Sequence, residues 1–176
     1  MKIIDLSKTI TNEMEVYPGD PEVSIQQVHT LETEGWRLRL LSFGSHTGTH
    51  VDAFSHMDEH GDTIDNIPLA NFCGQARIVK LGQKFPTELG LMFKDGTVDS
   101  SILTQLMEAK PKFVAVGNNG HLDINLEREL LKARILTFTD LINLDQLPED
   151  TPFTFFGVPL KIKNGDGSPI RAFAIV

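Results

Sequence analysis

The segment HTGTHVDAFSH, residues 46–56, concentrates side chains that can do metal chemistry. Three imidazoles and one carboxylate fall within it: His46, His50, Asp52 and His56. Two imidazoles and a carboxylate form a mixed nitrogen and oxygen set that suits Zn²⁺ or Mn²⁺. Three protein ligands leave a coordination position for water, as a catalytic metal requires. The alternative is that these histidines lie on a solvated strand or hydrogen-bond locally in a loop.

The spacing of these residues favours extended chain over a helix. At about 100° per residue, a helix would point Asp52 about 160° away from His50. In extended backbone the side chains alternate, so the four polar groups have the same parity and project to one side. Gly48 then leaves a gap where backbone could approach an ion closely. The intervening side chains face the other way: Thr47, Thr49 and Val51.

The composition describes a soluble globular chain that is one domain long, residues 1–176. The net charge of −8 comes without a basic cluster, which argues against nucleic acid and anionic membrane surfaces as partners. A small-molecule substrate is the partner we expect. The start MKIIDLSKTI lacks the pattern of a signal peptide, and Cys73 is the single cysteine, so we expect a cytoplasmic protein.

The elements that must position the histidine segment are mostly strands. Strand-like stretches cover residues 37–44, 76–81, 112–117, 153–163 and 170–176. The last two flank NGDGSP, which predicts a closing hairpin. Helical patterns cover residues 99–110 and 125–134. Strands outnumber helices and do not alternate regularly with them, which predicts an α+β fold with a largely antiparallel or mixed sheet.

The segment also resembles the signature H-x-G-T-H-x-D-x-x-x-H of the cyclase-like metal-dependent hydrolases, a family that includes bacterial kynurenine formamidase and isatin hydrolase. IDLSKTI, VYPGDP, TDLINLDQLP and GVPLKIKNGDGSPIRAFAIV extend the resemblance nearly end to end. It implies that His46, His50 and Asp52 bind the metal and that His56 is the catalytic acid/base. It also implies a swivelling β/β/α fold and a homodimer or larger homo-oligomer.

One departure from the family concerns a second metal. Its formamidases resemble each other in a segment whose histidine and glutamate complete a second metal site. In ERELLKARILTFTDLINL, Glu127 stands at the histidine position and Thr139 at the glutamate position. Thr139 cannot replace a bridging carboxylate, so we expect one divalent ion, Zn or Mn. Glu127 is either a further ligand or a solvated charge on a helix.

The function implied is metal-assisted hydrolysis of a small amide, formamide or lactam. A degenerate relative that binds a metal or small ligand without turnover is the alternative, which the altered second segment favours and the intact His56 opposes. Tyr17 and Phe54 are candidates for the walls of a substrate pocket, with core packing as the alternative. Of the other histidines, His29 and His60 lie in polar surroundings, and His121 either reaches the site or lies in a loop.

Overall fold

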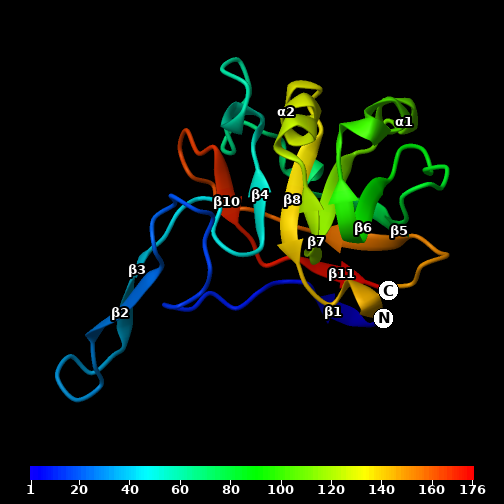
Figure 1. The fold of residues 1–176 in the computed structure, drawn as a ribbon. Coiled ribbons are helices and arrows are strands. Elements are labelled where there is room, and N and C mark those ends of the chain that lie inside the picture. Colours follow the sequence, from blue (N-terminus) through cyan, green and yellow to red (C-terminus); the bar gives the residue numbers. More distant parts are fainter.

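A nine-stranded mixed sheet forms the centre of the molecule, and two α-helices cover one of its faces (Figure 1). The computed structural model describes residues 1–176. The strand order is β1-β11-β9-β5-β6-β7-β8-β4-β10. The strands are β1 Ile3–Asp5, β4 His50–Asp52, β5 Cys73–Val79, β6 Gly90–Val98, β7 Phe113–Leu122, β8 Leu136–Leu141, β9 Phe153–Phe156, β10 Gly167–Pro169 and β11 Phe173–Ile175.

The middle of the sheet is parallel and its two sides are antiparallel. Strands β5, β6, β7 and β8 pair in parallel, whereas the remaining pairs are antiparallel. Both faces of the middle strands are buried, so their sequences read as continuous apolar runs. In β7, Phe113 packs into the larger core cluster and Val114 into the smaller one, which includes residues of both helices.

The two helices begin where the sequence offers an N-cap. Asp99 accepts a hydrogen bond from the Ser101 backbone at the start of a short 3₁₀ turn, which leads into α1, Leu103–Ala109. Asp123 accepts from two backbone amides of α2, Ile124–Lys132. Three leucines of this helix are buried: Leu126, Leu130 and Leu131. No helix is long and apolar enough to span a membrane.

A separate two-stranded ribbon projects from the body of the molecule (Figure 1). It consists of β2, Ser24–His29, and β3, Leu38–Ser42, and we call residues 24–42 the arm. The chain termini lie together at the β1 edge of the sheet, opposite the β10 edge, where β1 pairs with β11.

The predicted α+β class and the mixed sheet are confirmed, but several strands differ from the prediction. No predicted stretch covers β1, β2, β6, β8 or β10, and the strand predicted over residues 153–163 ends at Phe156. The closing hairpin is only partly correct. Strands β9 and β11 do pair, but the chain between them first travels to the opposite edge of the sheet, where β10 pairs with β4.

Candidate metal centre

The spacing predicted that the histidine segment is extended throughout. In the structure it is not one continuous strand. Only His50 to Asp52 form a strand, β4, so the period of two places these two side chains on one face. His46 precedes the strand in a turn, and His56 ends the 3₁₀ helix η1, Phe54–His56. Gly48 has φ of +62°, a left-handed conformation that few other residues adopt. The chain therefore bends between the two histidines.

The residues of opposite parity hold the segment in place. Val51 is fully buried in the larger core cluster. Thr49 is also buried; its hydroxyl donates to the Asp140 carbonyl over 2.7 Å and accepts from the Lys8 amide over 2.8 Å. The alternation predicted for this part of the chain is thus present, and it turns the polar face of β4 toward the candidate site.

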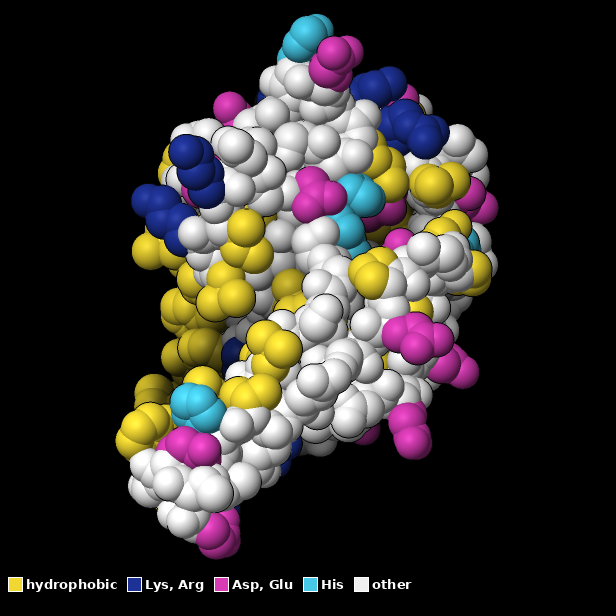
Figure 2. All heavy atoms as spheres, turned by 90° about the vertical axis from the view of Figure 1, so that its left-hand side faces the viewer, with side chains coloured by type: hydrophobic (Ala, Val, Ile, Leu, Met, Phe, Trp, Pro, Cys, Tyr) yellow, Lys and Arg dark blue, Asp and Glu magenta, His cyan; other side chains and the backbone are white.

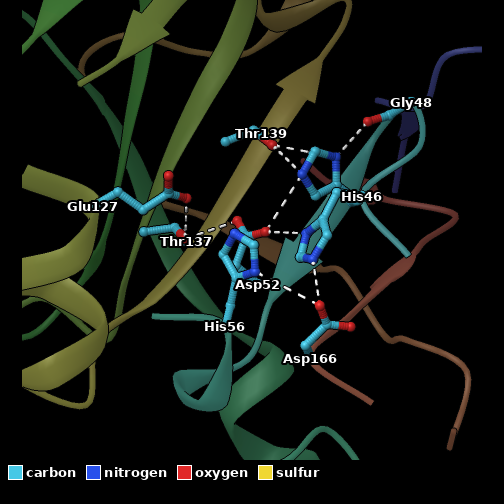
Figure 3. Close-up of polar contacts among 9 residues, drawn as sticks. His46, Gly48, Asp52, His56, Glu127, Thr137, Thr139 and Asp166 are labelled. Carbon is cyan, nitrogen blue, oxygen red and sulfur yellow. Dashed lines mark hydrogen bonds and ion pairs between the residues drawn. The ribbon is translucent and has the colours of Figure 1, made fainter. Parts of the chain in front are cut away.

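His46, His50 and Asp52 converge on one point (Figure 3). Oδ1 of Asp52 lies 2.7 Å from Nδ1 of His46 and 3.4 Å from Nε2 of His50. His50 donates its Nδ1 hydrogen to the Gly48 carbonyl over 2.7 Å, which leaves Nε2 as the nitrogen that can bind a metal. The contact with the Gly48 carbonyl thus selects the tautomer of His50.

These donor atoms fit a first-row divalent ion. Two nitrogens and one oxygen all lie within 4.8 Å of one another. Two donors at about 2.0–2.1 Å from a tetrahedral ion are about 3.3 Å apart, close to the separation between His50 and Asp52. His46 and Asp52 are closer than this because they share a hydrogen bond. Side-chain exposures of 16% for His46 and 14% for His50 leave the group open to solvent on one side.

Asp52 is the anionic centre of the group. Burial would by itself raise the pKa of Asp52, but the charges and hydrogen bonds of His50 and His46 hold it well below its usual range. Burial likewise lowers the pKa of His46, and Asp52 together with Asp166 outweighs it and raises that pKa to about 9. A negative pocket that attracts a proton this strongly also attracts a divalent cation.

His56 lies against His46, with ring centroids 4.0 Å apart. Burial and the neighbouring charge of His46 lower the pKa of His56. Its side chain is 28% exposed, and Figure 2 shows histidine side chains reaching the surface among acidic ones. The structure therefore brings His56 beside the candidate ligands and within reach of a bound molecule.

Asp166 is a site residue that the sequence analysis missed. Its Oδ2 lies 3.1 Å from Nε2 of His46 and 3.7 Å from Nδ1 of His56 (Figure 3). Together these three residues form a second group of metal-ligand type. Asp166 stands 120 residues after His46, in the turn that was predicted to close a hairpin. An acidic side chain between two glycines was the only signal in the sequence.

The second segment comes close to the site through α2 and β8. Thr139 pairs with His50 across the sheet, and its hydroxyl lies 3.0 Å from His50 Nε2. Thr137 pairs with Asp52, donates to its Oδ2 over 2.9 Å, and lies 3.1 Å from Oε1 of Glu127. Burial and the charge of Asp52 raise the pKa of Glu127 to about 8. Glu127 is therefore no solvated charge but a half-buried carboxyl linked to Asp52 through one hydroxyl.

The remaining candidates lie elsewhere. Tyr17 is 71% exposed in a turn, whereas Phe54 is 4% exposed and belongs to the larger core cluster, as the packing alternative expects. His29 accepts a hydrogen bond from the Trp36 indole in the arm. His60 is exposed in a loop, and His121 is exposed near the end of β7; neither belongs to a group of metal-ligand type.

Comparisons with known proteins show which family the chain resembles. Residues 4–112 match the protein-family model described as a putative cyclase. The chain is 27% identical to the kynurenine formamidase of Salinibacter ruber, an alignment that covers 98% of this chain and 96% of that protein. It is 33% identical to the kynurenine formamidase of Maricaulis maris over 44% of this chain and 38% of that protein.

Solved structures share the fold. Isatin hydrolase A from Labrenzia aggregata, bound to benzyl benzoate, superimposes with a TM-score of 0.85 at 21% identity, covering 99% of this chain and 93% of that chain. A predicted metal-dependent hydrolase from Bacillus stearothermophilus superimposes with a TM-score of 0.80 at 20% identity, covering 98% and 97% of the two chains. The swivelling β/β/α architecture expected from the sequence is therefore the architecture of the molecule.

Proposed function

Because the chain belongs to the putative cyclase family, we propose that it is a metal-dependent hydrolase of a small amide, formamide or lactam. The observation that carries this proposal is the convergence of His46, His50 and Asp52, with the His56 ring packed against that of His46. The likeness to a kynurenine formamidase over nearly the whole of both chains supports a formamide as the substrate class. The bond cleaved is then a carbon–nitrogen bond outside peptides.

We assign the metal ligands as His46, His50 and Asp52. A divalent ion held by these residues would lower the pKa of a coordinated water to about 7 and would polarise a carbonyl oxygen. Zn²⁺ and Mn²⁺ both accept this ligand set. Thr139 provides no second bridging carboxylate, so one ion per chain is proposed.

His56 supplies the proton transfers. With its pKa lowered, the imidazole is neutral near pH 7 and can accept a proton from the attacking water. It then donates that proton to the leaving nitrogen as the carbon–nitrogen bond breaks, which releases an amine and a carboxylic acid. The ring of His46 packs against this imidazole, with ring centroids 4.0 Å apart.

Hydrolysis assays with defined substrates test the proposal. The protein is freed of metal, loaded with Zn²⁺ or Mn²⁺, and offered N-formylated aromatic amines, a lactam and a cyclic imide. We expect turnover of the N-formyl compounds that requires the added metal. Absence of turnover by fully metallated protein favours the alternative function, metal or ligand binding without catalysis, which the substitution of the second segment supports.

We infer further that the chain forms a homodimer or larger homo-oligomer. The family resemblance implies one, and the arm carries apolar side chains that the chain itself leaves uncovered. A small-molecule substrate is the only other partner proposed.

A further inference from the structure

The imidazole of His46 connects two carboxylates. Its Nδ1 lies 2.7 Å from Oδ1 of Asp52, on the side of the candidate metal ligands. Its Nε2 lies 3.1 Å from Oδ2 of Asp166, on the opposite side of the ring (Figure 3). The ring therefore has one nitrogen directed into the candidate metal site and one directed out of it.

Backbone contacts hold Asp166 in this place. The Asp166 carbonyl accepts from the Ala53 amide over 2.8 Å, directly after β4, and the carbonyl of Gly165 accepts from Ile64 over 2.8 Å. A side chain at Gly167 would begin 2.5 Å from Cε1 of His46, so only glycine lets the turn approach the ring this closely. The carboxylate itself is half-exposed. The turn, and not burial of the side chain, fixes its position.

We propose that Asp166 is a positioning residue that sets the orientation and tautomer of His46 for metal binding. A neutral imidazole carries one hydrogen. When Asp166 accepts that hydrogen from Nε2, the lone pair of Nδ1 faces Asp52 and His50. A carboxylate on the outer nitrogen of a ligating histidine also increases the basicity of the inner one. This inference rests on the proposed metal site, but it does not depend on which substrate is hydrolysed.

A rival assignment uses the same residues as ligands. His46, His56 and Asp166 could hold a second cation directly. That site would need the lone pair of His46 Nε2, and in our proposal this nitrogen keeps its hydrogen and donates it to Asp166. The two assignments therefore differ in the number of ions bound and in the group that Asp166 contacts.

Calorimetric titration of the metal-free protein with Zn²⁺ alone tests the proposal. We expect Asp166→Ala to weaken zinc binding about 10–100-fold at an unchanged stoichiometry of one. Asp166→Asn should restore most of the affinity, because its amide oxygen can still accept from Nε2 while the charge is gone. Asp62→Ala is the matched control, since Asp62 is an exposed carboxylate whose backbone carbonyl accepts from Ser55 near η1; it should bind zinc as the parent does.

Each other outcome has a distinct meaning. If Asp166→Ala binds zinc as tightly as the parent, only the positioning role is overturned. If Asp166→Asn binds zinc as weakly as Asp166→Ala, the acceptor role is overturned. If Asp62→Ala loses as much zinc affinity as Asp166→Ala, the effect is one of net charge. Two zinc ions in the parent and one in Asp166→Ala establish the rival second site. A parent that binds no zinc overturns the proposed function together with this inference. Where the alanine variant does not fold, Asp166→Leu, which also lacks an acceptor, replaces it in the same titration beside Asp166→Asn.

Discussion

The three clustered imidazoles differ in their affinity for protons. Two carboxylates raise the pKa of His46 to about 9 against the effect of its burial, whereas burial and the charge of His46 lower the pKa of His56. Groups whose environments push their pKa values apart can take different roles in one reaction. His46 is thus suited to a cation partner and His56 to proton transfer.

This difference predicts separate effects for two alanine variants. His56→Ala should keep the bound metal and lower kcat about 10²–10⁴-fold, the usual contribution of general acid–base catalysis. His50→Ala should lose metal and activity together, because it removes a proposed ligand. His60→Ala, in an exposed loop, is the control and should change neither. Metal analysis and steady-state kinetics on an N-formylated aromatic amine measure both quantities, and full turnover by His56→Ala contradicts the assignment.

Asp52 should contribute more to metal binding than any outer residue. Asp52→Asn removes the anionic ligand with little change of shape, so zinc affinity should fall by more than the about 10–100-fold expected for an outer partner. Because Asp52 is 1% exposed and contacts both His46 and Thr137, the metal-free protein should also lose stability. Titration calorimetry and thermal unfolding check the two effects, and zinc binding as tight as in the parent excludes Asp52 as a ligand.

The stability of the metal-free protein should fall as the pH rises from about 6.5 to about 9. Burial lowers the pKa of His46 and His50, but Asp52 raises both above 6.5, so their stabilising protons are present below that pH and are lost as it rises. Burial raises the pKa of Glu127 to about 8, and its contribution has the same sign. Because the pKa of His56 is lowered, this residue affects the pH dependence of stability only below pH 6.5.

Urea unfolding in the presence of a chelator measures this dependence. His46→Gln should make the free energy of unfolding less dependent on pH in this range. The contribution of His46 to the decrease is at most about 3 kcal/mol. A free energy of unfolding that increases between pH 6.5 and 9 contradicts the assignment of these shifts.

At the scale of elements, the sequence predicted the site better than the chain path that builds it. Alternation in β4 explains His50 and Asp52, but His46 and His56 reach the same point from a turn and a 3₁₀ helix. Local periodicity cannot describe such changes of backbone direction. Asp166 could not be predicted from the sequence for a different reason. Strand β10 pairs with β4 only because the chain crosses to the opposite edge of the sheet after Phe156. That pairing is set by tertiary structure, and no local pattern encodes it.

The first residue of β10, Gly167, should therefore tolerate no side chain. A Cβ there would lie 2.5 Å from the His46 ring and 2.9 Å from the Val51 carbonyl, so the ring or β4 must shift. Gly167→Ala should lower stability by about 1–3 kcal/mol and weaken zinc binding. In Gly44→Ala the nearest atom lies 3.5 Å away, and both properties should stay unchanged. Chemical denaturation measures the stability of Gly167→Ala and Gly44→Ala, and calorimetry measures their zinc affinity. Equal stability and equal affinity of the two variants contradict this account of the turn.

At the scale of the whole molecule, the arm is the element that a single chain leaves incompletely packed. A lone two-stranded ribbon is marginally stable in water and needs a further strand or surface to pack on. Large apolar side chains of the arm are nevertheless exposed on both of its faces: Val28, Trp36, Leu38, Leu40 and Leu41. Hydrophobic side chains also gather along the side of the body next to the ribbon (Figure 2). A second copy of the chain would cover such a surface with apolar side chains of its own arm.

Leu40→Asp should for this reason shift the protein toward monomers. Leu40 is 56% exposed, and burying a leucine in an interface contributes about 1.5–3 kcal/mol. In a symmetric dimer the change occurs twice, so the dissociation constant should increase at least about 100-fold. Leu69→Asp, at a leucine that is 66% exposed outside the arm, should leave assembly unchanged. Sedimentation velocity over a range of concentrations measures the masses. A parent that sediments as a monomer throughout shows that the arm is not a self-association surface, while equal dissociation by both variants assigns the interface to the body of the molecule as well.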